Sequence, residues 1–145
     1  MDTIVLSDAE FDYASERPLA EAIKAGFPSP AEDYMRDAID FNRDMIRNPE
    51  TTFYGRVSGD SMVDAGIGDG DIAVIDRSLL AHDGDIVVAY VNNEFTIKIL
   101  DLSHRVDGYV ELRPANPRYV PIRIHNTDNF EVWGVVVYTI RQWRH

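Results

Sequence analysis

The sequence contains no cysteine, and it lacks both a long hydrophobic run and an excess of positive charge. Without cysteine the chain has no disulfide, no thiolate metal site and no cysteine nucleophile, and nothing indicates an oxidising compartment. The longest apolar stretches, residues 86–91 and 132–140, are too short or too interrupted to cross a bilayer, and the acidic N-terminus lacks the basic start of a signal peptide. We therefore expect a soluble protein of the cytoplasm, without a membrane partner.

The net charge is −11, because 25 Asp and Glu residues outnumber 14 Lys and Arg. Proteins that bind phosphate backbones tightly need clustered Lys and Arg, so tight direct binding to DNA is not expected. The acidity is compatible with protein partners. With 145 residues, 45% of them hydrophobic, the chain can bury one compact core.

The first half of the chain predicts little regular structure. Residues 1–25 carry six acidic and two basic side chains with no sustained apolar period, which favours a flexible N-terminal arm. We expect residues 26–51 to form an extended or helical connector. Within it, Ser29 is a candidate cap for a short helix over residues 30–47, which would end before Pro49.

Residues 52–145 change to short, β-branched apolar runs separated by turn residues, the pattern of a mainly β domain. About seven strands are predicted, over residues 53–58, 71–76, 85–91, 94–100, 110–113, 122–124 and 130–140. Asn92–Asn93 and Asp107–Gly108 are candidate hairpin turns, since these residues tolerate positive φ. Trp133 and Trp143 are expected in the core, and the long last strand could pair across a dimer.

One short stretch carries the candidate chemistry, "VSGDSMVDAGIGDGDIAVID" at residues 57–76. Ser61 lies at its first corner, where it either helps the chain turn or acts as a nucleophile. A serine nucleophile needs a base that removes its proton. Four histidines leave a Ser-His-Asp arrangement open, because such a triad is recognised by geometry and not by spacing: His82, His104, His125 and His145.

The other candidate base is Lys98, in "EFTIKIL". In strand alternation it shares a face with Thr96 and Leu100. Against apolar neighbours the charged form of a lysine loses solvation and its pKa falls, so a Ser-Lys dyad is chemically feasible. The alternative interpretation is a lysine on an edge strand that prevents aggregation between sheets.

The aspartates of residues 57–76 suggest a calcium loop at first sight. They miss the alternating carboxylates, the glycine and the distal Glu of an EF-hand, so we interpret them as turn formers: Asp60, Asp64, Asp69, Asp71 and Asp76. We expect no metal and no cofactor.

Three motifs in order, "AGFPSPAEDY", "SGDSM" and "EFTIKIL", resemble the LexA/UmuD family of self-cleaving repressors and mutagenesis proteins. The resemblance covers about residues 19–137. It implies a largely β domain like that of signal peptidases, with Ser61 as nucleophile and neutral Lys98 as general base. It also implies that the bond cut is Ala25–Gly26, in the arm.

The resemblance further implies a function in the SOS response of bacteria. Self-cleavage would turn the protein into the active accessory subunit of an error-prone translesion DNA polymerase. The implied partners are a second copy of the chain, a RecA filament on single-stranded DNA that stimulates cleavage, and a UmuC-type polymerase subunit. The remaining alternatives are a non-catalytic interaction subunit of that polymerase and a LexA-like regulator fragment. A complete LexA-type repressor is not expected, since only 25 residues precede the cleavage bond, and a membrane signal peptidase would need an anchor.

Overall fold

The computed structural model describes residues 3–8, 40, 43, 45–126 and 128–145. The chain divides into two units, Met1–Asp8 with Thr51–His145 and Ala9–Glu50, and the first holds the sheet. The bond expected to be cleaved, Ala25–Gly26, and most of the helix predicted over residues 30–47 lie outside the described residues. Within the described residues, no helix has the length and apolar character needed to span a membrane.

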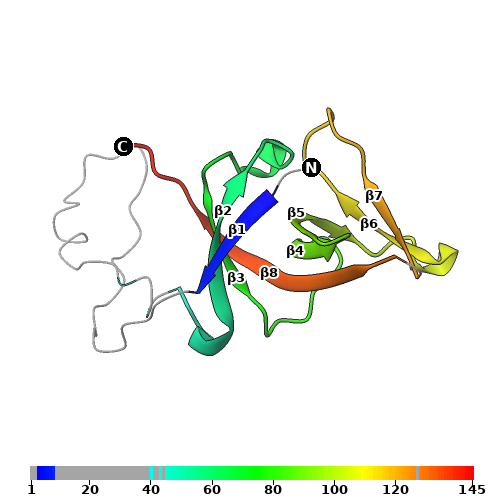
Figure 1. Ribbon diagram of the computed structural model, residues 1–145, viewed down its shortest axis with the longest axis horizontal. Coiled ribbons are helices and arrows are strands. Elements are labelled where there is room, and N and C mark those ends of the chain that lie inside the picture. Colours follow the sequence, from blue (N-terminus) through cyan, green and yellow to red (C-terminus); the bar gives the residue numbers. More distant parts are fainter. Residues whose placement is uncertain (1–2, 9–39, 41–42, 44, 127) are drawn as a thin grey trace, which may run out of the picture. The chain divides into compact units, whose positions relative to one another are not determined.

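An antiparallel eight-stranded sheet forms this unit, in the order β1-β2-β3-β8-β4-β5-β6-β7 (Figure 1). The strands are β1 Thr3–Asp8, β2 Thr52–Ser58, β3 Ile72–Asp76, β4 Ile86–Val91, β5 Glu94–Asp101, β6 Tyr109–Arg113, β7 Ile122–His125 and β8 Phe130–Ile140. Short 3-10 turns lie at η1 Pro49–Thr51, η2 Val63–Ala65 and η3 Arg105–Asp107. The predicted mainly β fold is confirmed, and its seven strands correspond to β2–β8.

Strand β1 was not predicted, because Thr3–Asp8 lies inside the stretch interpreted as an arm. It pairs with β2 from Thr3 opposite Ser58 to Asp8 opposite Phe53, and Ile4 is buried in the core. The sheet also curls until β1 lies against β5. These contacts are distant in sequence, so local apolar periodicity carries no signal for them.

The two candidate turns differ in geometry. Asn92 and Asn93 both have positive φ, 49° and 69°, and link Val91 to its partner Glu94 as a two-residue hairpin, which confirms that prediction. Asp107–Gly108 also lies between antiparallel neighbours, β5 and β6, but in a longer connection. There Gly108, at φ 87°, ends η3 in the left-handed conformation.

Strand β4 is buried on both faces, and its alternation divides the core in two. Val88 belongs to a cluster with Met62, Ile75 and Ile97, whereas Val87 and its alternate neighbours belong to a second cluster. The predicted core position of Trp133 is confirmed by its packing on the first cluster and its ring contacts to two phenylalanines.

The prediction for Trp143 is wrong, since its side chain is 82% exposed. It lies beyond the end of β8, where no strand covers it, and Arg141 lies over its ring.

Candidate active site

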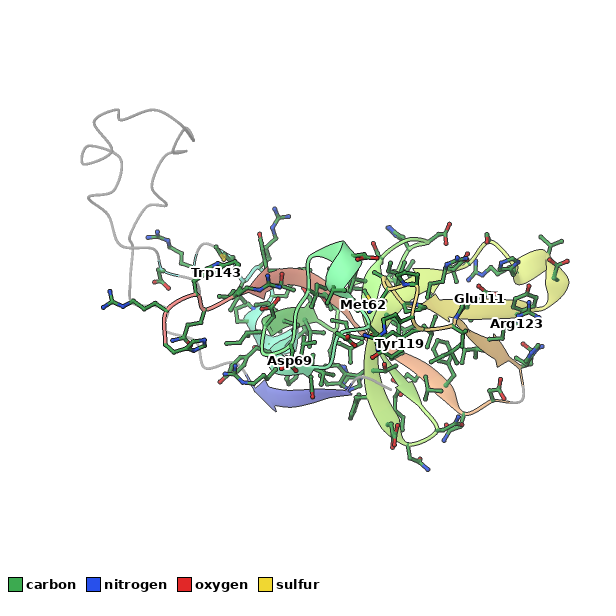
Figure 2. All side chains as sticks on the ribbon, turned by 90° about the horizontal axis from the view of Figure 1, so that it is seen from above. Met62, Asp69, Glu111, Tyr119, Arg123 and Trp143 are labelled. Carbon is green, nitrogen blue, oxygen red and sulfur yellow. The ribbon has the colours of Figure 1, made fainter. Side chains whose placement is uncertain are left out.

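Ser61 lies at the corner where the chain leaves β2. Gly59, with φ 103°, makes the bend possible, and its N–H donates to Asp69 Oδ1 at 2.8 Å across the turn. Met62, the next residue after the serine, lies among the core side chains before the η2 turn (Figure 2). The corner therefore fixes Ser61 between a glycine-permitted bend and a buried anchor.

Lys98 Nζ lies 2.9 Å from Ser61 Oγ, so the structure brings together the two side chains that the sequence singled out. Both are buried, with Ser61 0% and Lys98 3% exposed. Two further oxygens lie 3.0 Å from Nζ, Thr96 Oγ1 and the carbonyl of Ile97. Lys98 also pairs across the ladder with Val87, which is fully buried.

The three described partners of Lys98 are neutral oxygens, and their number matters for its chemistry. An ammonium donates three hydrogen bonds, whereas a neutral amine donates two and accepts one. If Thr96 Oγ1 and the Ile97 carbonyl take the two N–H groups, the lone pair faces the Ser61 hydroxyl. The arrangement can therefore receive the Ser61 proton. Burial acts in the same direction, because it disfavours the charged form of a lysine.

The loop between β6 and β7 braces the serine corner, a feature that sequence reasoning missed. Ala115 N–H donates to the Ser61 carbonyl at 2.8 Å, and the Ala115 carbonyl accepts from Asp64 N–H at 2.8 Å. Asn116 Nδ2 donates to the Asp60 carbonyl at 3.0 Å, and the Tyr119 hydroxyl donates to Asp60 Oδ1. In the sequence this loop, residues 114–121, is rich in proline, with nothing that indicates contact with position 61.

An ion pair closes the far side of the same turn. Arg141, just beyond β8, donates to both carboxylate oxygens of Asp71 at 2.8 Å. This hydrogen bond holds the pKa of Asp71 below its usual value, and Gly68 N–H contributes in the same direction. The pair ties the end of the turn to the last strand.

The two alternative explanations for Lys98 and Ser61 are not supported by this geometry. The edge-strand interpretation is wrong, because Lys98 is buried and β5 lies between β4 and β6 in the sheet order. A Ser-His-Asp triad gains no support from the described contacts. His104 lies beside carboxylates of β5 and β6, and the side chain described against the Ser61 hydroxyl is Lys98. The other three histidines are exposed: His82, His125 and His145.

Residues 18–137 match a family model described as Peptidase S24-like. This span is more than half of the 145 residues. The chain belongs to the Peptidase S24-like family. The resemblance inferred from the three motifs is confirmed.

Named relatives of this S24-like chain cover most of its length. It is 43% identical to Protein MucA of Salmonella typhimurium over 122 residues, which are 83% of this chain and 80% of MucA. It is 40% identical to Protein SamA of Salmonella typhimurium over 131 residues, 90% of this chain and 89% of SamA. It is 43% identical to the LexA repressor of Syntrophotalea carbinolica over 135 residues, 90% of this chain but 64% of that repressor.

A second polar cluster in this S24-like domain joins β5, η3 and β6. His104 Nε2 lies 3.9 Å from both Asp101 Oδ2 and Glu111 Oε1, a grouping of ligand types that could hold a metal ion. Arginines already occupy those oxygens: Arg113 NH1 lies 3.1 Å from Asp101 Oδ2, and Arg123 Nε lies 3.5 Å from Glu111 Oε1. The cluster is therefore a network of opposite charges.

This network stabilises the ionised form of the Asp101 carboxyl group. Hydrogen bonds from the Ser103 hydroxyl and backbone N–H, with a further one from Arg113, lower the pKa of Asp101 to about 2. Three of the five aspartates interpreted as turn formers accept hydrogen bonds from nearby backbone N–H groups: Asp69 from Gly59, Asp71 from Gly68 and Asp76 from Ser78. Asp60 accepts instead from the distant Tyr119 hydroxyl.

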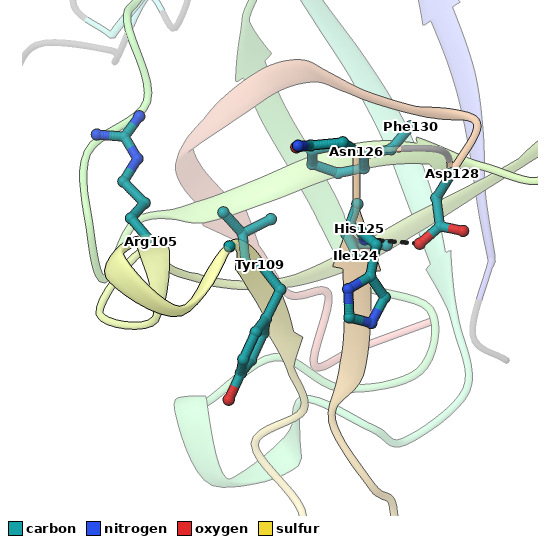
Figure 3. Close-up of a pocket in the computed structure, with 9 residues that line it drawn as sticks. Arg105, Tyr109, Ile124, His125, Asn126, Asp128 and Phe130 are labelled. Carbon is teal, nitrogen blue, oxygen red and sulfur yellow. Dashed lines mark hydrogen bonds between the residues drawn. The ribbon is translucent and has the colours of Figure 1, made fainter.

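A hollow of about 450 Å³ lies where η3, β6 and β7 meet, lined by side chains that include Arg105, Tyr109, His125 and Asp128 (Figure 3). His125 N–H donates to Asp128 Oδ2 across its rim. Neither Ser61 nor Lys98 belongs to this lining. The hollow is thus separate from the candidate active site.

Proposed function

We propose that this S24-family protein is a self-cleaving serine endopeptidase of the bacterial SOS response. Ser61 is the nucleophile, Lys98 is the general base, and the bond cut is Ala25–Gly26. Cleavage turns the protein into the active accessory subunit of an error-prone translesion DNA polymerase. The observation that carries the proposal is the buried 2.9 Å contact between Lys98 Nζ and Ser61 Oγ.

In the first step Ser61 Oγ attacks the carbonyl carbon of Ala25, and its proton moves to neutral Lys98 Nζ. Negative charge develops on the Ala25 carbonyl oxygen, and backbone N–H groups at the serine corner stabilise it. The tetrahedral intermediate collapses when the bond to the Gly26 nitrogen breaks. Lys98 returns the proton to that nitrogen, which leaves as the new amino terminus.

In the second step water releases the acyl group from Ser61. Lys98, neutral again, takes a proton from the water as it attacks the ester carbon, then returns a proton to Ser61 Oγ. The products are a free carboxylate on Ala25 and a regenerated dyad. No group outside Ser61, Lys98, the backbone and water is required.

Strand β1 limits where the cleavage bond can travel, since it is anchored to β2. Ala25 follows Asp8 by 17 positions, a length of chain that spans at most about 55 Å. A domain of about 100 residues has a radius of gyration of about 13 Å, so the bond can reach Ser61 of its own chain. The same reach permits cleavage of a partner chain in a dimer.

Cleavage changes both charge and surface in this scheme. It removes six acidic and two basic side chains, so the formal charge moves from −11 to −7. It also cuts β1 from the chain, which uncovers the edge of β2 for other partners. The cleaved product is the form that binds a UmuC-type polymerase in the bacterial cytoplasm. A RecA filament on single-stranded DNA promotes the reaction by favouring the position in which Ala25–Gly26 meets Ser61.

The direct test is the mass of the products. The purified chain is incubated near pH 10, or with RecA, ATP and single-stranded DNA at neutral pH. We expect fragments of 25 and 120 residues, cut after Ala25. A chain that stays intact under both conditions while remaining folded would favour the non-catalytic interaction subunit instead.

The proposal includes a homodimer, since the apolar strand β8 carries the exposed side chains Val137 and Tyr138. Light scattering at micromolar concentration should give twice the monomer mass of 16.4 kDa. A value at the monomer mass would exclude the dimer.

A further inference from the structure

We propose that Asn116 is a positioning residue that aims the Ser61 backbone N–H at the oxyanion formed during cleavage. The inference rests on the proposed function, since it concerns the same reaction. It is drawn from the contacts that the β6–β7 loop makes with the two peptide groups on either side of Ser61. Asn116 lies outside the three sequence motifs and outside the described contacts between Ser61 and Lys98.

The planarity of the peptide group links the Asp60 carbonyl to the Ser61 N–H. In a trans peptide the C=O of one residue and the N–H of the next lie in one plane and point in opposite directions. Asn116 Nδ2 donates to the Asp60 carbonyl at 3.0 Å, so it fixes the direction of that C=O. The Ser61 N–H belongs to the same plane and is thereby fixed in the opposite direction.

The neighbouring residue acts on the next peptide plane. Ala115 N–H donates to the Ser61 carbonyl at 2.8 Å, which fixes the direction of the Met62 N–H by the same geometry. Two consecutive residues of one loop therefore hold the two peptide planes that flank the nucleophile. The Ala115 contact is made by backbone alone, whereas the Asn116 contact depends on the identity of the side chain.

Asn116 is itself held in place. Its Oδ1 accepts from Arg118 N–H at 3.0 Å, and its backbone carbonyl accepts from Tyr119 N–H at 3.1 Å. The residue is 9% exposed, so little water competes for its amide. Because both the oxygen and the nitrogen of the Asn116 amide are hydrogen-bonded, the side chain need not reorient when negative charge develops on the substrate oxygen. Donors that are already in position before the reaction stabilise an oxyanion best.

The chain offers a matched pair of variants. Asn116→Asp keeps the oxygen that accepts from Arg118 N–H and removes the donor to the Asp60 carbonyl. Asn116→Ala removes both without adding charge. Arg118→Ala is the control, because the backbone of Arg118 contacts Asn116 and its exposed side chain does not enter the argument.

The rate of self-cleavage is measured in the full chain as a function of pH, together with the rate at which a fluorophosphonate labels Ser61. Removing an oxyanion donor outright costs about 10²–10³-fold, and losing only its aim should cost about 10–100-fold in both rates. In Asn116→Ala, which adds no charge, the pH of half-maximal cleavage should not move, since Lys98 and Ser61 are untouched. Arg118→Ala should behave as the unaltered chain.

The assignment is overturned if both Asn116 variants cleave and label at the original rates. It is also overturned if the loss of rate equals the loss of folded protein measured by thermal unfolding. In Asn116→Ala, which adds no charge, a shift in the pH of half-maximal rate would also overturn it, because it would mean that Asn116 acts through Lys98. The unaltered chain and Ser61→Ala run alongside. If the unaltered chain does not cleave, the proposed function is wrong. If the unaltered chain and Asn116→Asp cleave at the same rate, only the role of Asn116 is wrong.

Discussion

Two clusters of polar side chains lie on neighbouring parts of the same sheet, and they differ in the charge of the groups around their central side chain. Around Lys98 the described partners are a serine hydroxyl, a threonine hydroxyl and a backbone carbonyl, all neutral. Around His104 the partners are carboxylates, which arginines neutralise in turn. Both clusters include β5, with Lys98 and Asp101 only three positions apart.

The basic side chains of the two clusters also differ in their exposure to water. Lys98 is buried, while the arginines of the second cluster keep half or more of their side-chain surface exposed, 50% for Arg113 and 63% for Arg123. An exposed, paired charge is stable as a charge and contributes little else. A buried amine with neutral partners is biased toward its uncharged form, which is the form that can take a proton. The two clusters therefore differ in the charge of their partners. Lys98 is buried beside neutral oxygens, whereas the buried carboxylates of Asp101 and Glu111 pair with exposed arginines.

The largest expected effect comes from removing either member of the dyad. Ser61→Ala and Lys98→Ala should each abolish cleavage within the sensitivity of mass spectrometry, since the two residues act as a unit. His104→Ala, in the charged cluster, should cleave at the rate of the unaltered chain. Cleavage lost in His104→Ala and kept in Lys98→Ala would reverse the comparison.

A smaller effect is expected from Thr96→Val, which is nearly isosteric. It removes one of the two oxygens that orient the amine of Lys98, at a fully buried position. We expect a fall in cleavage rate of about tenfold, the equivalent of one hydrogen bond. Thr139→Val, at an exposed position on β8, is the matched control and should have no effect. Equal rates in both variants would show that Thr96 does not orient the base.

The smallest effect concerns the charged cluster and appears in stability. The pKa of Asp101 is lowered to about 2 in the folded protein, against about 3.9 in an unfolded chain. Its contribution to stability is therefore present above about pH 4 and is lost as the pH falls toward 2. Asp101→Asn should lower the free energy of unfolding at pH 7, and the difference should vanish toward pH 2, as urea titrations can measure. A difference that stays constant with pH would mean that the charge of Asp101 is not involved. The cleavage rate at neutral pH should not change.

Much of this fold was predictable because most of its strands are marked by local patterns in the sequence. The runs that became β2–β8 alternate or end at turn residues, and Asn92–Asn93 has the positive φ that its residue type allows. Ser61 and Lys98 were singled out because a lysine in an apolar strand is unusual and because the three motifs resemble a family whose nucleophile and base match these positions. What the sequence could not supply depends on contacts between distant residues. These are the pairing of β1 with β2 and the hydrogen bonds from Ala115 and Asn116 to the serine corner.

The most direct test of the central claim is the rate of self-cleavage of the full chain, without RecA, measured from pH 6 to pH 11. Deprotonation of Lys98 supplies the base, so the rate should rise with pH. Since Lys98 is buried among neutral oxygens, the rate should level off with a midpoint well below the value of about 10.4 at which a free lysine titrates. A rate that still rises steeply above pH 10, with Ser61 and Lys98 intact, would contradict the claim that burial prepares Lys98 as the base.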